Sequence, residues 1–308
     1  MKLIVTGGCG FIGSHFIDYA VEQNDQIIAI DNLIVGSEKN IENAKKSGNV
    51  KLLKNDILNL DHIQNEFDNV DGIVHFAART GVIESLEKPK EFSNVNALGT
   101  LNLLELCRKF SIPNFILAST GAVYGNHKAP FNENMIPDPI SPYAASKVSA
   151  ENYCISYRNT YGIKSTILRF TNVFGPRKSF GPYANVIPKF VRAALRNEPI
   201  TIFGDGSQER DFVFVKDIVN ACYLVLKNKK FGTFNIGTGK NTNLNDLIEI
   251  IESTLLYKFK RNYVDFRDGE AKYAFSSIQK AENELNYTPQ YTLNDGIKEY
   301  IDYEKTQF

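Results

Sequence analysis

Hydrophobic positions in the first half of the chain alternate between two patterns. Short apolar runs, typical of strands that are covered on both faces, predict strands at Lys2–Val5, Gln26–Ile30, Val50–Leu53, Gly72–Phe76, Asn114–Ala118 and Ser165–Phe170. Longer stretches with helical periodicity separate them, notably Phe11–Gln23, Phe92–Phe110 and Tyr143–Tyr161. This β-α-β order predicts an α/β fold with a doubly wound parallel sheet and right-handed crossovers.

The rhythm of the sequence changes after Phe170. Glycine and proline cluster within 175–188, and the elements that follow are short and mixed. Helices are expected to start near three capping residues, Asn243, Ser276 and Thr292. We therefore expect a sheet domain at 1–170, to which 211–237 returns, and a smaller mixed α/β lobe at 171–308 against the carboxyl edge of the sheet.

The bulk composition narrows the classes of function. The 308 residues include 35 basic and 35 acidic side chains, which gives no reason to expect nucleic acid or an anionic membrane as partner. No apolar stretch reaches the ~18 residues that span a bilayer, and the apolar start is too short for a secretion signal. The four cysteines lie far apart and the four histidines lack ligand spacing. We expect a soluble, cytoplasmic protein without disulfides or a metal site.

A glycine-rich turn follows the first predicted strand. Gly7, Gly10 and Gly13 give a G-x-x-G-x-x-G pattern that opens the first helix. A dinucleotide pyrophosphate needs such a turn, because a backbone without Cβ atoms lets the phosphates approach a helix N-terminus. A glycine pattern alone is weak support, but here it has the strand-turn-helix context that the motif requires. We expect these glycines, with Phe11 and Ile12, to bind the dinucleotide.

The second predicted strand leads into an acidic residue, Asp31, eighteen residues after Gly13. A carboxylate at this place can hold both hydroxyls of the adenosine ribose and repels a 2′-phosphate. The neighbouring Asn32 and Leu33 offer no arginine for NADP, so the sequence predicts NAD. The alternative is that Asp31 only caps a loop. At the end of the third strand, Asp56 and Ile57 are placed to meet the adenine.

Catalytic chemistry is suggested by Tyr143 and Lys147, which form a Y-x-x-x-K pair. Residues four apart share a helix face, so we expect the ammonium to lower the pKa of the phenol and make Tyr143 a general base. The fifth strand ends in Ser119 and Thr120, whose hydroxyls are expected at the ligand crevice, with Thr120 binding the reacting oxygen. Each motif has an alternative interpretation: Tyr143 and Lys147 as a surface contact on a helix, and Ser119 and Thr120 as the start of a loop. Their order along the chain favours a catalytic set.

With these motifs in this order, the sequence resembles the extended short-chain dehydrogenase/reductases, specifically the nucleotide-sugar epimerase/dehydratase group. The resemblance covers essentially the whole chain. It rests on VTGGCGFIGSH at the start, Asp31–Leu33, His75–Ala78, Asn94–Asn96, Gly99-Thr100, Ser119–Gly125, Tyr143–Lys147, Arg169–Pro176, Phe203–Gly206 and Arg210–Phe212. It implies a Rossmann-like NAD-binding domain and a C-terminal lobe that binds a nucleotide sugar.

The resemblance also implies roles for single residues. Tyr143 is the base, Lys147 binds the nicotinamide ribose, and Thr120 orients the 4-hydroxyl of the sugar. Further cofactor contacts are implied at Phe76, Ala77, Ala78 and Asn96. Contacts to the nucleotide sugar are implied at Asn172, Arg210 and Arg267 for the diphosphate, Val186 beside the base, and Ala274 near C2 of the sugar. For the two arginines, a surface salt bridge is the alternative.

The residues after Thr120 separate the branches of this group. Its 4,6-dehydratases carry an Asp-Glu pair there and its decarboxylases keep a glutamate, whereas this chain has Gly121 and Ala122, which transfer no proton. Reversible oxidation at C4 of a UDP-hexose is therefore the simplest chemistry. The small Ala274 predicts room for a C2 substituent such as N-acetyl. Because Arg79 or Thr80 can meet a C6 carboxylate, UDP-glucuronate stays open.

Other functions and the assembly are left as alternatives. A UDP-glucuronate 4-epimerase or decarboxylase, a 4,6-dehydratase or a 4-reductase would share the fold, and a catalytically silent NAD-binding regulatory protein would differ in class. The intact Tyr143 and Lys147 count against the silent protein. The resemblance further implies a homodimer formed by 92–110 and 143–161 of each subunit.

Overall fold

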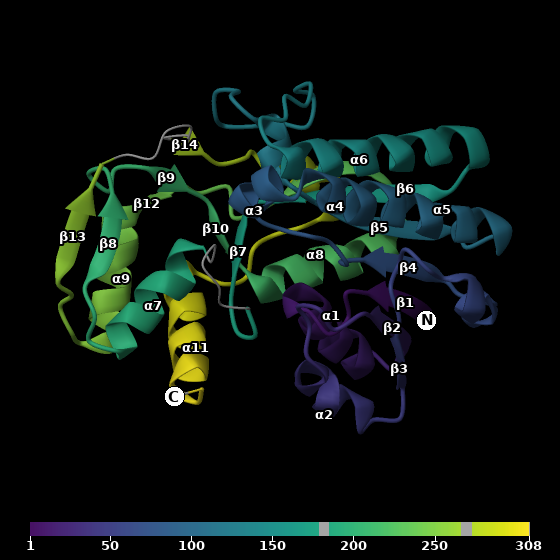
Figure 1. Ribbon diagram of the computed structural model, residues 1–308, viewed down its shortest axis with the longest axis horizontal. Coiled ribbons are helices and arrows are strands. Elements are labelled where there is room, and N and C mark those ends of the chain that lie inside the picture. The colour runs from purple at the N-terminus through teal and green to yellow at the C-terminus, as the bar shows by residue number, and fades with distance from the viewer. Residues whose placement is uncertain (179–184, 266–272, 308) are drawn as a thin grey trace.

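The computed structural model describes residues 1–178, 185–265 and 273–307 (Figure 1). Its centre is a seven-stranded parallel sheet with the order β11-β6-β5-β4-β1-β2-β3. The strands are β1 Lys2–Thr6, β2 Gln26–Asp31, β3 Val50–Lys54, β4 Gly72–His75, β5 Asn114–Thr120, β6 Lys164–Phe170 and β11 Gly232–Ile236. The expected doubly wound sheet is confirmed. Its strand order reverses between β1 and β4, and in sheets of this kind ligands bind at the carboxyl ends of the strands beside such a reversal.

Helices cover both faces of this sheet (Figure 1). One face carries α1 (Phe11–Glu22), α2 (Glu42–Lys45) and α8 (Val215–Asn228). The other carries α3 (Val82–Glu87), α4 (Pro89–Ser93), α5 (Gly99–Lys109) and α6 (Pro142–Tyr161). Successive side chains of β1 point to opposite faces of the sheet. Leu3 and Val5 therefore pack in one buried core and Ile4 packs in the other. The short 3₁₀ segments are η1 Glu38–Ile41, η2 Asp61–Phe67 and η4 Gly121–Tyr124.

The helix expected at 92–110 differs from the prediction. It begins at Pro89, and a π-helical turn, η3 (Asn94–Leu98), separates α4 from α5. The side chain of Asn96 lies in this turn and is bonded to a loop and to α6, contacts that periodicity cannot reveal. Such π-turns occur often at functional sites.

Most of the remaining elements form a smaller lobe beside the carboxyl edge of the sheet (Figure 1), whereas α10 (Gln279–Leu285) packs on β11 and α8. The elements of the lobe are β7 Asn172–Phe174, α7 Val186–Leu195, β8 Ile200–Phe203, β9 Glu209–Arg210, β10 Phe212–Phe214, β12 Thr242–Asn243, α9 Leu244–Leu255, β13 Arg261–Val264, β14 Tyr273–Ala274 and α11 Leu293–Lys305. The pairs are β10 with β7, β13 with β8, and β9 between β12 and β14. Within 211–237, β11 lies next to β6 in the large sheet and α8 packs on α1.

Two of the three expected helix caps are confirmed. Asn243 caps α9, and Thr292 caps α11 in a capping box with Asp295. The prediction at Ser276 is wrong. Ser276 is buried and forms a β-bridge with Phe131, and α10 starts only at Gln279. A long-range contact here outweighs the local capping preference of serine.

The two lobes share one buried core. Residues that pack under the sheet, such as Phe16, belong to the same cluster as Phe174, Phe214 and Tyr300 of the smaller lobe. We therefore expect the lobes to hold a fixed relative position. Within the described residues, no helix combines the length and the apolar character needed to cross a membrane.

Candidate active site

The glycine-rich turn leaves no room for side chains. Gly7 has φ +65°, and a Cβ there would lie 2.6 Å from the backbone nitrogen of Ala77. A Cβ on Gly13 would lie 2.2 Å from the carbonyl oxygen of Gly7. Gly10 precedes the first helical residues, Phe11 and Ile12, and no side chain caps the N-terminus of α1. The turn therefore presents bare backbone and a helix N-terminus, which suits the pyrophosphate of NAD.

Asp31 is tied directly to this turn. Its carboxylate accepts hydrogen bonds from the backbone N–H groups of Cys9 at 2.9 Å and Leu33 at 2.8 Å, and the residue is 7% exposed. Asn32 donates its side-chain amide to the carboxylate of Asp56 at 2.8 Å. The carboxyl ends of β2 and β3 are thereby joined, with Ile57 packed behind them. The predicted adenosine contacts thus lie together at one end of the crevice.

The loop after β4 forms the opposite wall of the turn. Phe76 donates its N–H to the carbonyl of Thr6 at 3.0 Å, and Ala77 follows it against Gly7. Beyond Ala78, the side chain of Asn96 accepts from the N–H of residue 79 at 2.8 Å. Its two side-chain N–H groups donate to the carbonyl of Arg79 at 3.0 Å and to the hydroxyl of Ser146 at 2.9 Å. Asn96 therefore fixes this loop to α6.

Tyr143 and Thr120 meet at the end of β5. The side chain of Ser141 caps α6 by accepting the N–H of Ala144 at 3.2 Å, and Pro142 occupies the first helical position. This start places Tyr143 in the first turn, where its phenol lies near the hydroxyl of Thr120, which acts to lower the phenol pKa. The structure thus brings together the predicted base and the predicted ligand of the reacting oxygen.

Lys147 lies one turn further along α6 and is 4% exposed. Its ammonium donates to the carbonyl of Ala118 at 2.9 Å. Burial lowers the pKa of Lys147 to about 8, and the charge of Glu151 opposes this shift. Because its pKa is close to neutral, small changes in nearby charge alter how much of Lys147 is protonated.

The expected lowering of the Tyr143 pKa by Lys147 is wrong for these residues. Burial raises the pKa of the phenol above its ordinary value, and only the hydrogen bond with Thr120 opposes the rise. The Lys147 ammonium is directed at the carbonyl of Ala118. The cost of burying a phenolate, which residue spacing does not reveal, outweighs the attraction of a nearby positive charge.

Ser119 does not share the position of Thr120. The hydroxyl of Ser119 donates to the carboxylate of Glu151, two turns further along α6 than Tyr143, at 2.5 Å. Glu151 is paired in turn with Arg169 on β6 at 2.7 Å. The sequence analysis missed this buried pair. Its signal is the glutamate four residues after Lys147, which extends the Y-x-x-x-K spacing by one more turn.

The small lobe gathers most of the predicted substrate contacts. Arg210 on β9 lies opposite Ala274 on β14 in the strand register. Asn172 donates its side-chain amide to the carbonyl of Asp211 at 3.2 Å, which ties it to the residue after Arg210. Val186 is the first residue of α7. Arg267 lies outside the described residues.

Asp211 anchors this part of the site, although the sequence analysis gave it no role. Its buried carboxylate accepts from the N–H and hydroxyl of Thr238 and from the N–H of Gly239. Burial raises the pKa of Asp211 to about 6. These bonds hold the strand that carries Arg210 against the loop after β11.

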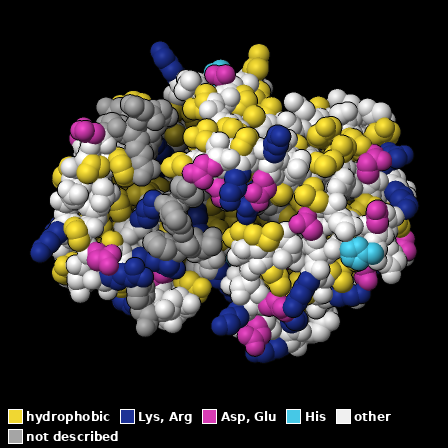
Figure 2. All heavy atoms as spheres, viewed as in Figure 1, with side chains coloured by type: hydrophobic (Ala, Val, Ile, Leu, Met, Phe, Trp, Pro, Cys, Tyr) yellow, Lys and Arg dark blue, Asp and Glu magenta, His cyan; other side chains and the backbone are white. Residues whose placement is uncertain are grey.

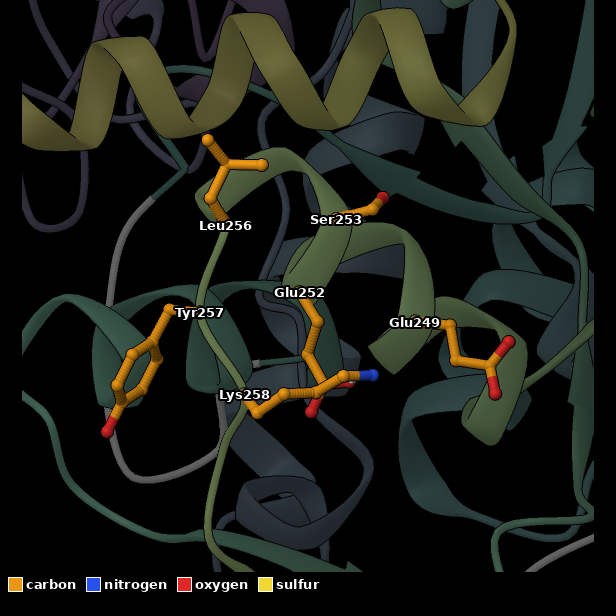
Figure 3. A pocket seen from close by; sticks show the side chains of 6 residues that line it. All are labelled: Glu249, Glu252, Ser253, Leu256, Tyr257 and Lys258. Atoms are coloured by element: carbon orange, nitrogen blue, oxygen red, sulfur yellow. Dashed lines mark hydrogen bonds and ion pairs between the residues drawn. The ribbon is translucent and has the colours of Figure 1, made fainter.

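The hollow at the end of α9 is a different feature (Figure 3). Its lining is Glu249, Glu252, Ser253, Leu256, Tyr257 and Lys258. The carboxylate of Glu252 is already bound by Lys258 at 2.8 Å, Arg261 at 3.0 Å and the N–H of Phe259 at 3.0 Å. These contacts engage Glu252 in ion pairs and a backbone hydrogen bond, so it is not free to act as an acid or base here. Figure 2 shows basic and acidic side chains interspersed over the visible face, without a large patch of one sign.

Comparison with known proteins identifies the family of this chain. Residues 3–237 match the family model described as the NAD dependent epimerase/dehydratase family. The chain is 40% identical over 305 residues to a Methanocaldococcus jannaschii protein named "Putative UDP-glucose 4-epimerase", and the match covers 98% of each chain.

Solved structures are similar over the whole chain. A UDP-N-acetylglucosamine 4-epimerase from Methanobrevibacter ruminantium, in complex with UDP-N-acetylmuramic acid, has a TM-score of 0.96 and 34% identity, covering 100% of this chain and 99% of that one. A UDP-glucose 4-epimerase from Thermotoga maritima with UDP-glucose has a TM-score of 0.93 and 35% identity, with the same coverage.

Proposed function

Because the chain belongs to the NAD-dependent epimerase/dehydratase family, we propose that it inverts a UDP-hexose at C4 through a transient 4-keto sugar. The observation that carries the proposal is the placement of Tyr143, in the first turn of α6, next to Thr120 at the end of β5. The next residues, Gly121 and Ala122, transfer no proton. A site with one proton-transferring group at C4 suits oxidation and reduction at that carbon.

In this mechanism Tyr143 handles the proton of the 4-hydroxyl. Thr120 holds the sugar oxygen while the phenolate removes its proton, and the same group returns the proton when the 4-keto sugar is reduced. When bound, NAD supplies the hydride acceptor and then the hydride donor. Lys147, whose ammonium donates to the carbonyl of Ala118, would bind the nicotinamide ribose, as its family counterparts do. The glycine turn and Asp31 fit this cofactor because of their close backbone packing and ribose-facing carboxylate.

The substrate is proposed to have an uncharged C6 group. Arg79 pairs with Glu91 and lies 3.5 Å from Glu84, so protein carboxylates already balance its charge. A C6 carboxylate would have to compete with both of them. We therefore propose UDP-glucose and UDP-N-acetylglucosamine as better substrates than UDP-glucuronate.

Room at C2 is proposed from Ala274. It lies opposite Arg210 in the strand register, and its side chain is a single methyl group. A similar protein of known structure is named for UDP-N-acetylglucosamine, which supports the proposal. Replacing Ala274 by Tyr should suppress turnover of the N-acetylated sugar and spare UDP-glucose. Equal loss of both activities would contradict a role in C2 selection.

The assembly is proposed to be a homodimer in the cytoplasm. The outer surface of α5, α6 and the preceding π-turn exposes Leu98, Tyr153 and Tyr161. Apolar side chains on neighbouring helices suit a twofold helical interface. The four buried cysteines, all unpaired, are consistent with a reducing compartment. Light scattering should give twice the chain mass, and Tyr153→Glu should halve it.

Turnover of three substrates tests the proposed function. Purified protein with catalytic NAD is incubated separately with UDP-glucose, UDP-N-acetylglucosamine and UDP-glucuronate, and the products are resolved by chromatography and NMR. A C4 epimer without net change in NADH supports the proposal. A 4-keto-6-deoxy sugar or released carbon dioxide points to another branch of the family. Bound NAD with no turnover of any of the three contradicts these substrates, and points first to a different nucleotide sugar and then to the silent regulatory protein.

A further inference from the structure

We propose that Glu151, paired with Arg169, is a positioning residue that holds the catalytic segment of β5 in register with α6. The inference rests on the proposed function, since that function gives Tyr143, Lys147 and Thr120 their roles. Glu151 touches none of the reacting atoms. Its effect passes through the groups to which it is bonded.

The first observation is a set of three contacts between consecutive residues of β5 and one face of α6. The helical partners are four residues apart, so they lie one above the other along the helix. The contacts pair Ala118 with Lys147, Ser119 with Glu151, and Thr120 with Tyr143. A shift between β5 and α6 would therefore disturb all three at once.

The second observation concerns the other end of the same segment. Arg169 donates to both carboxylate oxygens of Glu151, at 3.0 and 2.7 Å, and its remaining terminal nitrogen donates to the Tyr124 hydroxyl at 2.9 Å. Tyr124 lies four residues after Thr120 and donates onward to Asn235 at 2.6 Å. The Glu151–Arg169 pair thus holds the chain on both sides of Thr120.

Burying the charges of Glu151 and Arg169 costs free energy of folding, which their hydrogen bonds must offset. Glu151 is 2% exposed and Arg169 is 5% exposed, and taking two charges out of water offsets much of their attraction. Well-packed apolar residues can fill the same volume. They would not bond Ser119 or Tyr124 and would not place a negative charge near Lys147. The pair therefore does more than fill the core.

The charge of Glu151 gives a readout that a purely structural residue would not move. Lys147 faces Glu151 and Cys154 on α6, and His75 on β4 interacts with it electrostatically. Burial raises the pKa of the Cys154 thiol and lowers the pKa of His75 to about 3, so both are neutral at physiological pH. Glu151, bonded to the Arg169 guanidinium, is the charged member of these three neighbours. Removing its charge should lower the pKa of Lys147.

The experiment titrates Lys147 by NMR in protein labelled with carbon-13 at the lysine ε-carbon, with Lys147→Arg to assign the signal. Glu151→Gln is compared with Glu252→Gln, which neutralises another buried, arginine-bonded glutamate far from the site. We expect the pKa of Lys147 to fall in the first variant and to stay at the wild-type value in the second. An unchanged Lys147 pKa in folded Glu151→Gln would overturn the proposal. Since no turnover is needed, this result is independent of the proposed reaction.

Two milder variants separate charge from placement and cover the case in which Glu151→Gln fails to fold. Glu151→Asp keeps the charge but shortens the arm, so the Lys147 pKa should stay near the wild-type value while kcat falls. Ser119→Ala removes the hydrogen bond from Ser119 to Glu151. It should lower kcat roughly tenfold with little change in KM, which is less than the ~100-fold loss that a 1 Å misplacement can cause. Unchanged kcat in both variants would overturn the positioning role. Absent turnover in the wild type would instead refute the proposed function, leaving the titration as the test.

Discussion

Tyr143 illustrates how local rules and burial combine at a single residue. Its place at the start of α6 follows from Ser141 and Pro142, which end the preceding loop and set the helix direction. Its pKa follows from burial, which raises it despite the contact with Thr120. Burial therefore favours the neutral phenol, and the contact with Thr120 favours its ionised form. Removing the phenol hydroxyl tests the proposed role of Tyr143 as the base.

Tyr143→Phe should abolish epimerisation and leave the fold intact. Loss of a general base typically costs on the order of 10²–10⁴ in rate. The variant should still bind NAD, because the residues proposed to contact the cofactor at the ends of β1, β2 and β4 are unchanged. Steady-state turnover and NAD content after purification measure the two effects. Wild-type turnover by this variant would exclude Tyr143 as the base.

His75 carries a second prediction, on the pH dependence of stability. It is 1% exposed and bonded to Thr6 at 2.6 Å and to Thr100 at 3.1 Å. Burial, then the charge of Lys147, lowers its pKa to about 3. Between about 6.5 and 3 the unfolded chain binds a proton at this residue and the folded chain does not, so the free energy of unfolding falls as pH falls.

Urea unfolding at about pH 7.5 and pH 5 measures this effect through its slope of at most ~1.4 kcal/mol per pH unit. His75→Gln should flatten the dependence, whatever its absolute stability. His62→Gln, at an exposed position, serves as the control and should follow the wild type. If His75→Gln loses stability with pH as steeply as the wild type does, the histidine is not the source.

At the scale of elements, the strands and the glycine turn follow from local patterns because each is specified by a few neighbouring residues. Apolar runs place the first six strands within one or two residues, and the backbone at Gly7 needs a residue that tolerates φ +65°. The close approach of Ala77 to this turn joins β1 to β4. Adding one methyl group at Gly7 therefore tests whether this close packing of the turn is needed for cofactor binding.

Gly7→Ala should weaken NAD binding sharply, because its Cβ would meet the Ala77 backbone at 2.6 Å. Gly162→Ala is the matched control: it also has a left-handed φ, +72°, but nothing lies within 4 Å of its Cβ. Both variants carry about 1–2 kcal/mol of backbone strain. Calorimetric titration with NAD should therefore show a loss of affinity only for the first. Equal affinities would mean that the turn does not contact the cofactor.

The elements that the sequence did not predict depend on distant partners. The π-turn around Asn96 and the bridge of Ser276 to Phe131 each join segments far apart in the chain. The pair of Glu151 with Arg169 joins a helix to a strand. Residue spacing predicts candidate reacting groups such as Tyr143 and Lys147 because both lie on one helix. It did not identify the groups that hold those elements together.

On the scale of the whole molecule, the lobes are joined along α1 as well as through their core. Three contacts follow one face of this helix: the cation of Lys178 lies 5.3 Å from the ring of Phe11, His15 bonds the carbonyl of Pro176 at 3.0 Å, and Asp18 pairs with Arg177 at 2.6 Å. The segment after β7 therefore runs against the helix that begins at the cofactor turn. Such a molecule should unfold as one unit.

Phe174→Ala tests this cooperativity. The ring is 2% exposed in the shared core and packs on Phe214 at 5.5 Å between ring centroids. Its loss should cost ~3–5 kcal/mol, and calorimetry should still show one transition, with equal calorimetric and van't Hoff enthalpies. Two separated transitions in wild type or variant would show that the lobes fold independently.

Turnover of UDP-glucose in deuterium oxide with catalytic NAD tests the central claim, hydride transfer at C4 with Tyr143 as the proton-transferring group, most directly. Because the hydrogen that leaves C4 returns from the cofactor, both epimers should keep protium at every carbon, with no net change in NADH. Tyr143→Phe should give no epimer. Deuterium in the sugar ring, or stoichiometric consumption of NADH, would contradict the account.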